Sequence, residues 1–156
     1  MFLQEKFAAD ARDLELSFDS IKLLAKRYDN SIVSTLWRTV EERDPSQPVF
    51  GVISVHPRYP EIGKHDGPKP WRYFIRSAAF RTQFATVSPE KSFELITLHA
   101  TGRKTGPILS AQDILRDAIG NDWEFKIESF STKYALLTFG FPIRPRTVIV
   151  PTGHSV

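Results

Sequence analysis

Residues 17–43, SFDSIKLLAKRYDNSIVSTLWRTVEER, contain two helical patterns in succession. In the first half, apolar residues recur every three or four positions after Ser17, whose hydroxyl can cap the start of a helix. Asp29 and Asn30 interrupt this pattern, and both tolerate turn and left-handed conformations. Ser31 then provides a second cap before another apolar stripe. The stretch therefore predicts a helix, a tight turn and a second helix, which is the helix-turn-helix pattern.

The second helix of such a motif can enter the major groove of DNA. Residues 17–44 carry five Lys or Arg side chains and five Asp or Glu side chains, so their charges cancel. Phosphate binding favours a clearly basic stripe, and two amphipathic helices can also pack together without any DNA. Both interpretations stay open. If the motif contacts DNA, the expected residues are Lys26, Arg27, Ser31, Ser34, Thr35 and Arg38.

The composition is that of a globular protein. Of the 156 residues, 41% are hydrophobic and 25% are charged, which is typical of a soluble globular protein with enough apolar residues for a core. No apolar run approaches the roughly 20 residues that span a bilayer, and the first ten residues lack the layout of a secretory signal. We therefore expect a cytoplasmic protein with no membrane partner. The absence of cysteine excludes disulfides and thiolate chemistry, and a net charge of +3 permits nucleic-acid binding without demanding it.

The rest of the chain predicts an α+β fold. Residues 1–14 have a helical pattern, which with residues 17–43 gives a three-helix N-terminal unit, and the prolines after Arg43 mark a boundary. Residues 108–119 fit either a strand or a helical turn. We expect a helical unit over residues 1–44, a mainly antiparallel sheet domain with at least one helix over 48–150, and a tail over 151–156. The sheet domain is predicted from strands at 49–55, 71–77, 123–130 and 134–139 and a helix from 88 to about 100.

No constellation for catalysis is present. There is no HExxH, no phosphate loop and no GxGxxG, and the TGRKTG segment at 101–106 has the wrong spacing for a phosphate loop. His65 and Asp66 are the nearest approach to a metal or acid–base pair, and a solvated loop histidine is the favoured interpretation. The sequence therefore predicts no catalytic residue, no metal site and no cofactor.

Residues 58–81 are distinctly basic, with six Lys or Arg against two acidic side chains and interleaved aromatic residues. If Arg72 and Arg76 share one strand face, as their even spacing suggests, they can hold an anionic ligand or a nucleic-acid backbone. The alternative is a solvated sheet face or an interface with a missing partner. The expected ligand-binding residues are Trp71, Arg72, Tyr73 and Arg76.

Four segments resemble the C-terminal half of ImmA/IrrE-family proteins: EKFAADARDL at 5–14, SFDSIKLLAKRYDNSIVSTLWRTVEE at 17–42, WRYFIRSAAF at 71–80 and EFKIESFSTKYALLTFGF at 124–141. The most specific is LAKRYDNSIVSTLWRTVE at 24–41. Members of this family typically have a zinc metallopeptidase domain with HExxH, then a helix-turn-helix-like unit, and longer members add a GAF-like sensory domain. The resemblance implies that residues 1–44 match the helical unit and residues 48–150 the GAF-like domain.

The peptidase motif of the family is absent, so peptidase activity is not expected of this chain. The resemblance implies a fragment or a naturally truncated relative. The expected function is a non-catalytic regulatory or sensory module of a bacterial or phage stress or mobile-element regulator, which binds an anionic small ligand, a peptidase domain or a repressor protein. The alternatives are a transcriptional regulator that binds double-stranded DNA through the helix-turn-helix, and a protein-interaction domain only.

Overall fold

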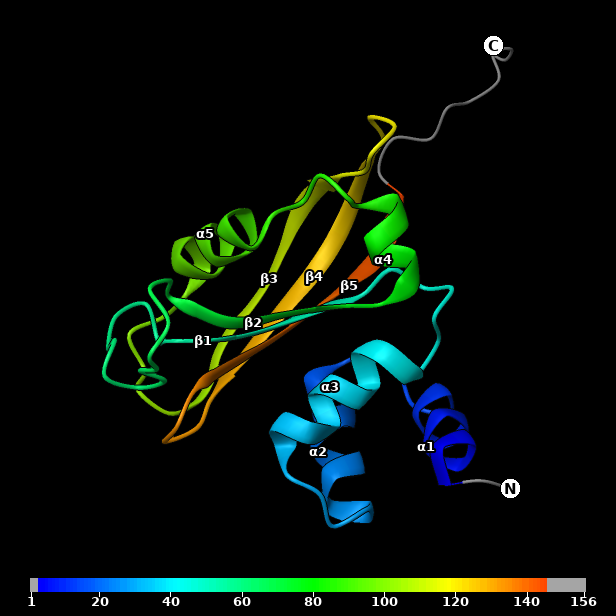
Figure 1. Ribbon diagram of the computed structural model, residues 1–156, viewed down its shortest axis with the longest axis horizontal. Helices are drawn as coiled ribbons and strands as arrows, with labels where there is room; N and C mark the ends of the chain where they lie inside the picture. Colours follow the sequence, from blue (N-terminus) through cyan, green and yellow to red (C-terminus); the bar gives the residue numbers. More distant parts are fainter. Residues whose placement is uncertain (1–2, 146–156) are drawn as a thin grey trace.

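A computed structural model describes residues 3–145 and shows three N-terminal helices followed by a five-stranded antiparallel sheet and two further helices (Figure 1). None of the described helices is long and apolar enough to cross a bilayer. The elements are α1 (Leu3–Arg12), α2 (Phe18–Arg27), α3 (Ile32–Glu42), β1 (Phe50–Ser54), β2 (Trp71–Arg76), α4 (Ala78–Gln83), α5 (Pro89–His99), β3 (Gly106–Arg116), β4 (Asp122–Ser131) and β5 (Leu136–Pro145).

The α+β class and the three-helix N-terminal unit are confirmed, and the undecided stretch at 108–119 contributes to strand β3. The strand order is β2-β1-β5-β4-β3, so β1 lies inside the sheet between β2 and β5. Its five residues are all buried, because helices cover both of its faces. The division into domains and the GAF-like assignment stay predictions, and the expected tail at 151–156 lies outside the described residues.

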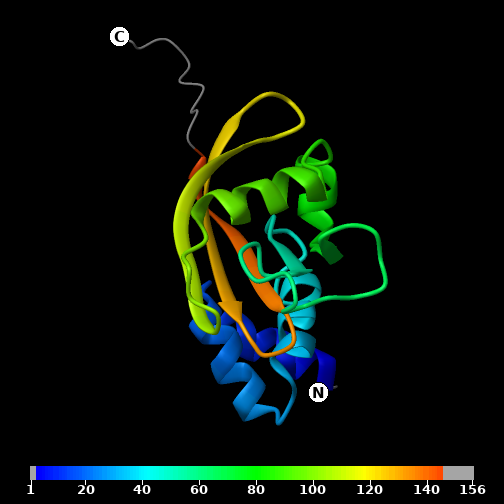
Figure 2. The same cartoon turned by 90° about the vertical axis from the view of Figure 1, so that its left-hand side faces the viewer.

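The sheet separates two hydrophobic cores (Figures 1 and 2). On one face, α4 and α5 pack on Phe50 and Val52 of β1, and Phe80 and Phe84 join that cluster. On the other face, the helical unit packs on the remaining side of the sheet. That second cluster consists of Phe18, Ile21, Leu36, Val40, Val49, Ile53, Ile75, Leu137, Phe139 and Phe141.

The turn and cap signals of residues 17–43 are confirmed. The hydroxyls of Ser17 and Ser31 accept hydrogen bonds from the backbone N–H groups of Ser20 and Ser34 at the starts of α2 and α3. Asp29 has a φ of 52°, the left-handed conformation expected of the turn between the helices. The local chemistry of this stretch therefore specifies its backbone as the sequence predicts.

One polar contact joins the helical unit to the sheet, and others hold its helices together. The backbone N–H of Phe18 donates to the carboxylate of Glu128 on β4 at 2.7 Å, which places a negative charge at the positive end of α2. The guanidinium of Arg43 donates to the carbonyl oxygens of Ala11 and Leu14, both at 3.0 Å, and so holds the end of α1 against the end of α3. Burial lowers the pKa of Arg43.

Candidate functional site

Helix α3 is a packing element. It lies between the other two N-terminal helices and the sheet, and its Leu36 and Val40 are fully buried there. Thr35, expected at a DNA groove, is also fully buried, and its hydroxyl donates to the carbonyl oxygen of Ser31 at 2.8 Å. Thr35 therefore does not present its side chain to any ligand in this conformation.

The other residues expected at DNA have structural partners or lie elsewhere. The guanidinium of Arg38 lies 4.0 Å from the ring centroid of Phe7 and 3.4 Å from the carboxylate of Glu42. The hydroxyls of Ser31 and Ser34 bond to each other at the start of α3. Lys26 and Arg27 are exposed, but they lie on α2. The structure therefore does not gather these six residues on one open face of α3.

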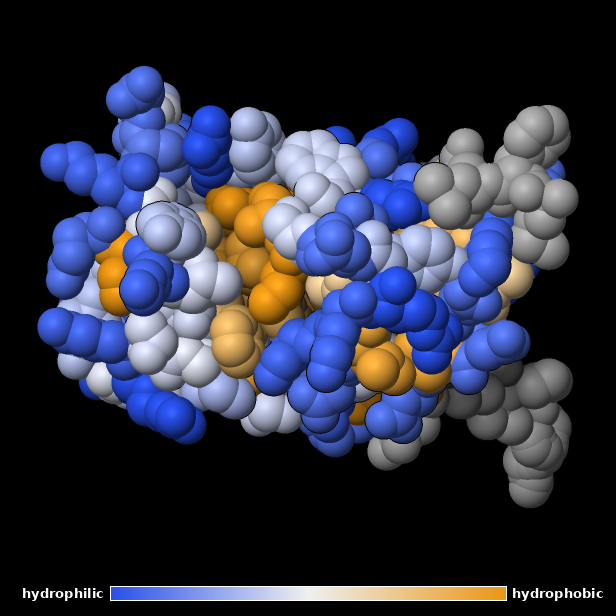
Figure 3. All heavy atoms as spheres, turned by 90° about the horizontal axis from the view of Figure 1, so that it is seen from below, coloured by the Kyte–Doolittle hydropathy of each residue, from blue (hydrophilic) through white to orange (hydrophobic). Residues whose placement is uncertain are grey.

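Seen from the side of the helical unit, apolar side chains gather in the middle of the face within a hydrophilic rim (Figure 3). Leu23 and Val33 are among the exposed apolar residues that the helical unit contributes. A DNA-binding face is instead expected to carry a continuous basic stripe.

A β-bulge divides the ligand residues expected on β2. Ile53 of β1 pairs with Tyr73 and the next residue, Ser54, pairs with Trp71, so Arg72 has no partner across the ladder. The extra residue reverses the alternation of side chains at this point. Trp71 packs near Phe93 of α5, with ring centroids 6.4 Å apart. Trp71 therefore lies on the α5 side of the sheet, while Tyr73 and Ile75 lie on the side of the helical unit.

Arg72 and Arg76 do not converge either. The Arg72 guanidinium lies 5.2 Å from the ring centroid of Tyr73, whose ring contacts Trp37 of α3. The Arg76 guanidinium lies 5.3 Å from the ring of Phe74, which packs in the core on the α5 side. The bulge thus separates the two arginines that even spacing had placed together.

The connection between β1 and β2, residues 55–70, is held in a defined shape. His56 is fully buried, and its Nδ1 accepts a hydrogen bond from the backbone N–H of Arg58. Its Nε2 therefore carries the proton and donates to the carbonyl oxygen of Arg103 at 2.6 Å. The Tyr59 hydroxyl donates to the carbonyl oxygen of Gly102 at 2.9 Å. These bonds join the connection to residues 100–105, which follow α5 and lie beside it in Figures 1 and 2.

A glycine also fixes this connection. Gly63 has a φ of +89°, and a Cβ there would lie 2.4 Å from the carbonyl oxygen of Ser54. Only glycine fits both the left-handed conformation and this close approach to β1.

Six exposed cations gather on the β1–β2 connection, the start of β2 and the segment after α5, and we call them the basic end. The same region carries only two exposed carboxylates, Glu61 and Asp66, so its net charge is +4. The net charge of the whole chain is +3. Among residues 3–145, no ion pair engages any of the six. The cations are Arg58, Lys64, Lys69, Arg72, Arg103 and Lys104.

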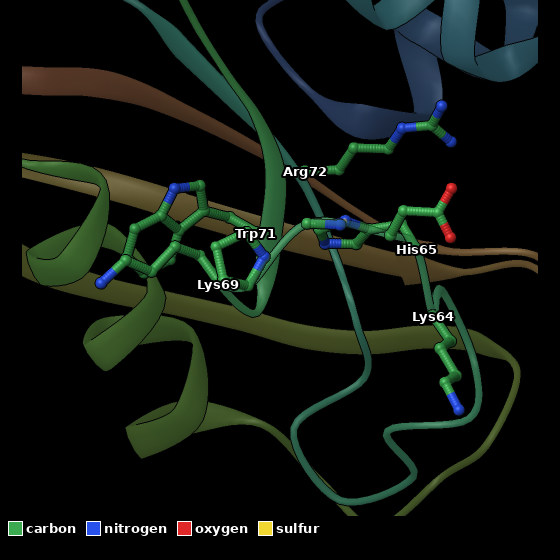
Figure 4. Close-up of a pocket in the computed structure, with 8 residues that line it drawn as sticks. Lys64, His65, Lys69, Trp71 and Arg72 are labelled. Carbon is green, nitrogen blue, oxygen red and sulfur yellow. The ribbon is translucent and has the colours of Figure 1, made fainter.

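The basic end contains an open cavity of about 610 Å³. Figure 4 shows the His65 ring among the lining side chains, with Lys69 lying by Trp71, while Lys64 and Arg72 extend in other directions. The cavity is lined by Lys64, His65, Asp66, Gly67, Pro68, Lys69, Trp71 and Arg72.

His65 offers a hydrogen-bond donor without a protein partner. Its Nδ1 accepts from the backbone N–H of Gly67 at 3.0 Å, so the proton resides on Nε2. That Nε2 atom is buried, and it has no hydrogen-bond partner among the described residues. A buried donor of this kind is costly unless something accepts from it. A Cβ on Gly67 would lie 2.8 Å from the His65 ring, so the glycine allows the ring to sit there.

A further cavity, of about 680 Å³, runs along α5 and shares Trp71 with the basic end. Its apolar part includes Phe93 and the exposed Leu98, and its rim carries Glu90, Glu94 and Asp113. Within residues 3–145, no group of three or more His, Asp or Glu side chains is placed to hold a metal ion.

Comparisons with known proteins identify no relative: no protein-family model, no curated protein and no solved structure matches this chain. The class of the protein is therefore given by its fold alone, an α+β protein with three N-terminal helices and a five-stranded antiparallel sheet. The ImmA/IrrE resemblance stays a prediction.

Sequence reasoning missed part of the site. The basic count over residues 58–81 covers four of the six cations of the basic end, whereas Arg103 and Lys104 enter the sequence analysis only as part of a rejected phosphate loop. His56 and Tyr59, which bring the two segments together, carry no sequence signal, because their bonds are to backbone carbonyls 47 and 43 residues away.

Proposed function

We propose that this protein is a non-catalytic regulatory module that binds an anionic ligand at the basic end. The observation that carries the proposal is the set of six exposed cations without an ion-pair partner among residues 3–145, three of which line a cavity together with His65. Cations that form no ion pair keep their charge available for a ligand.

The rigid attachment of the basic end supports this function. His56 and Tyr59 fix two segments of the chain against each other before any ligand arrives, so little conformational entropy is lost on binding. Trp71 lines both the cavity and the groove along α5.

Thermal unfolding with added anions tests the proposal, because a ligand that binds the folded state raises its stability. Inorganic tripolyphosphate and a panel of nucleotides are added at low salt to the full chain. We expect stabilisation of several degrees, which is lost in Lys64→Gln/Lys69→Gln and kept in the charge-matched control Lys26→Gln/Arg27→Gln. Equal responses of both variants, or no response to any anion, would refute the proposal.

Double-stranded DNA binding through the helix-turn-helix is the second candidate. The capped helix pair with its left-handed turn favours it, and Lys26 and Arg27 are exposed. Labelled duplex DNA tests it by fluorescence anisotropy. If Lys26→Ala and Arg38→Ala leave duplex affinity unchanged, the recognition-helix model is excluded.

A further inference from the structure

We propose that the anion recognised at the basic end is single-stranded nucleic acid. This inference rests on the proposed function and names its ligand class. The first argument is the direction of the cations. Lys69 lies by Trp71, while Lys64 and Arg72 extend away from it, so these side chains do not converge on one point (Figure 4). A single phosphate group would engage few of them, whereas a chain with repeated phosphates can pass from one to the next.

The second argument is that the cations extend beyond the cavity. Arg58 lies on the β1–β2 connection, and Arg103 and Lys104 lie on the segment after α5, to which that connection is bonded. None of these three lines the cavity of about 610 Å³. A ligand confined to the cavity would leave them unused, while an extended polyanion would reach both segments.

The third argument concerns aromatic rings beside the cations. The ammonium of Lys104 lies 5.0 Å from the ring centroid of Tyr59, and that of Lys69 lies 5.9 Å from the ring centroid of Trp71. Both rings are partly exposed. Alternation of aromatic platforms with cations is how proteins bind single strands without strong sequence preference, because unpaired bases stack on the rings while the cations follow the phosphates.

The same rings distinguish this ligand from other polyanions. An acidic peptide has charges but no bases to stack, and the bases of a duplex are already stacked on each other. The six cations also lie on two loops and the start of β2, and none of them lies on a helix that could enter a major groove. A single strand uses both the charges and the rings.

The test is fluorescence anisotropy of the full chain with a labelled oligothymidylate of about 16 nucleotides, titrated over a range of salt concentrations. Competitors are the same sequence as a duplex, polyglutamate and inorganic tripolyphosphate. We expect binding that weakens steeply with salt, with a slope reduced by about 0.7 for each cation that Lys64→Gln, Lys69→Gln or Lys104→Gln removes. Lys6→Gln, at an exposed lysine of α1 that belongs to neither candidate site, is the control and should keep both the affinity and the slope.

Two substitutions at Trp71 test whether its ring contributes to oligonucleotide binding. Trp71→Leu should weaken oligothymidylate binding by at least about fivefold, while Trp71→Phe keeps a ring and should restore most of it. Thermal unfolding of both variants controls for loss of packing on Phe93.

The outcomes separate the two proposals. Tripolyphosphate stabilisation without oligonucleotide binding would overturn single-stranded recognition and leave anion binding intact. Equal competition by polyglutamate, or tighter binding of the duplex, would also overturn it. No response to any anion would overturn both proposals.

Discussion

Helix α3 and the basic end differ in whether their polar side chains already have partners within the protein. On α3, the hydroxyls of Ser31 and Thr35 are used within the helix, and Arg38 is paired with Glu42. At the basic end, the polar side chains that hold the structure are His56 and Tyr59, and the lysines and arginines take no part in any described ion pair. Polar side chains of α3 thus have partners within the helical unit, while the cations of the basic end have no ion-pair partner among the described residues.

The largest expected effect comes from breaking the packing role of α3. Leu36 is fully buried in the cluster between the helical unit and the sheet, so Leu36→Ala should lower the free energy of unfolding by roughly 2–5 kcal/mol. Urea denaturation measures this, with Val33→Ala, at an exposed position of the same helix, as the control. If Leu36→Ala costs no more than Val33→Ala, α3 is not the packing element described here.

A smaller effect is expected from the residue that assembles the basic end. His56→Ala removes the donor to Arg103 and the acceptor from Arg58, and buried groups left unpaired cost about 1–3 kcal/mol. Anion affinity should fall as well, because Arg103 loses its fixed position. His56→Gln keeps a donor and an acceptor in a side chain of similar reach, so it should lose less of both. Unchanged anion affinity in a folded His56→Ala protein would show that the junction does not organise the site.

Low pH should reduce stability through a third region, the β3–β4 turn, which is outside both α3 and the basic end. Asp117, in the β3–β4 turn, is largely buried, which by itself raises its pKa. The hydrogen bonds that it accepts from the Trp123 indole and from the backbone N–H groups of Asn121 and Ile119 outweigh burial, so its pKa lies below the ordinary value. A lowered pKa in the folded state gives stability that is present above the unfolded value of about 3.9 and is lost as pH falls through the folded pKa.

Asp117→Asn should therefore cost about 1 kcal/mol at neutral pH, and this difference from the original protein should shrink toward about pH 3. Chemical denaturation at several pH values measures it. A difference that stays constant with pH would mean that the carboxylate charge contributes nothing to the turn.

The smallest effects are expected at exposed cations of the helical unit. Lys26→Ala and Arg27→Ala should each change the free energy of unfolding by less than about 0.5 kcal/mol, since both side chains are exposed. Neither should alter affinity for tripolyphosphate. If either variant weakens anion binding as much as Lys64→Gln does, the contrast between the two regions fails.

The parts of the fold that the sequence predicts correctly depend on local chemistry. The capping serines, the left-handed Asp29 and the Ser88-Pro89 start of α5 act within a few residues, so a single sequence reveals them. The bulge at Arg72 cannot be predicted from the local sequence, because it depends on how β2 pairs with β1. That one pairing decides which side Trp71 faces, and so decides which residues of the expected ligand set can meet.

The junction between α2 and the sheet has a consequence for the order in which the chain folds. The backbone N–H of Phe18 pairs with Glu128 across 110 residues, and the apolar faces of α2 and α3 are covered in part by Leu137, Phe139 and Phe141 of β5. During synthesis the helices emerge long before the strand that completes their core. Isolated helices of 10 and 11 residues are only marginally stable in water. Their apolar faces therefore stay exposed until that strand has been synthesised. A ribosome that stalls between these segments would therefore present an aggregation-prone intermediate.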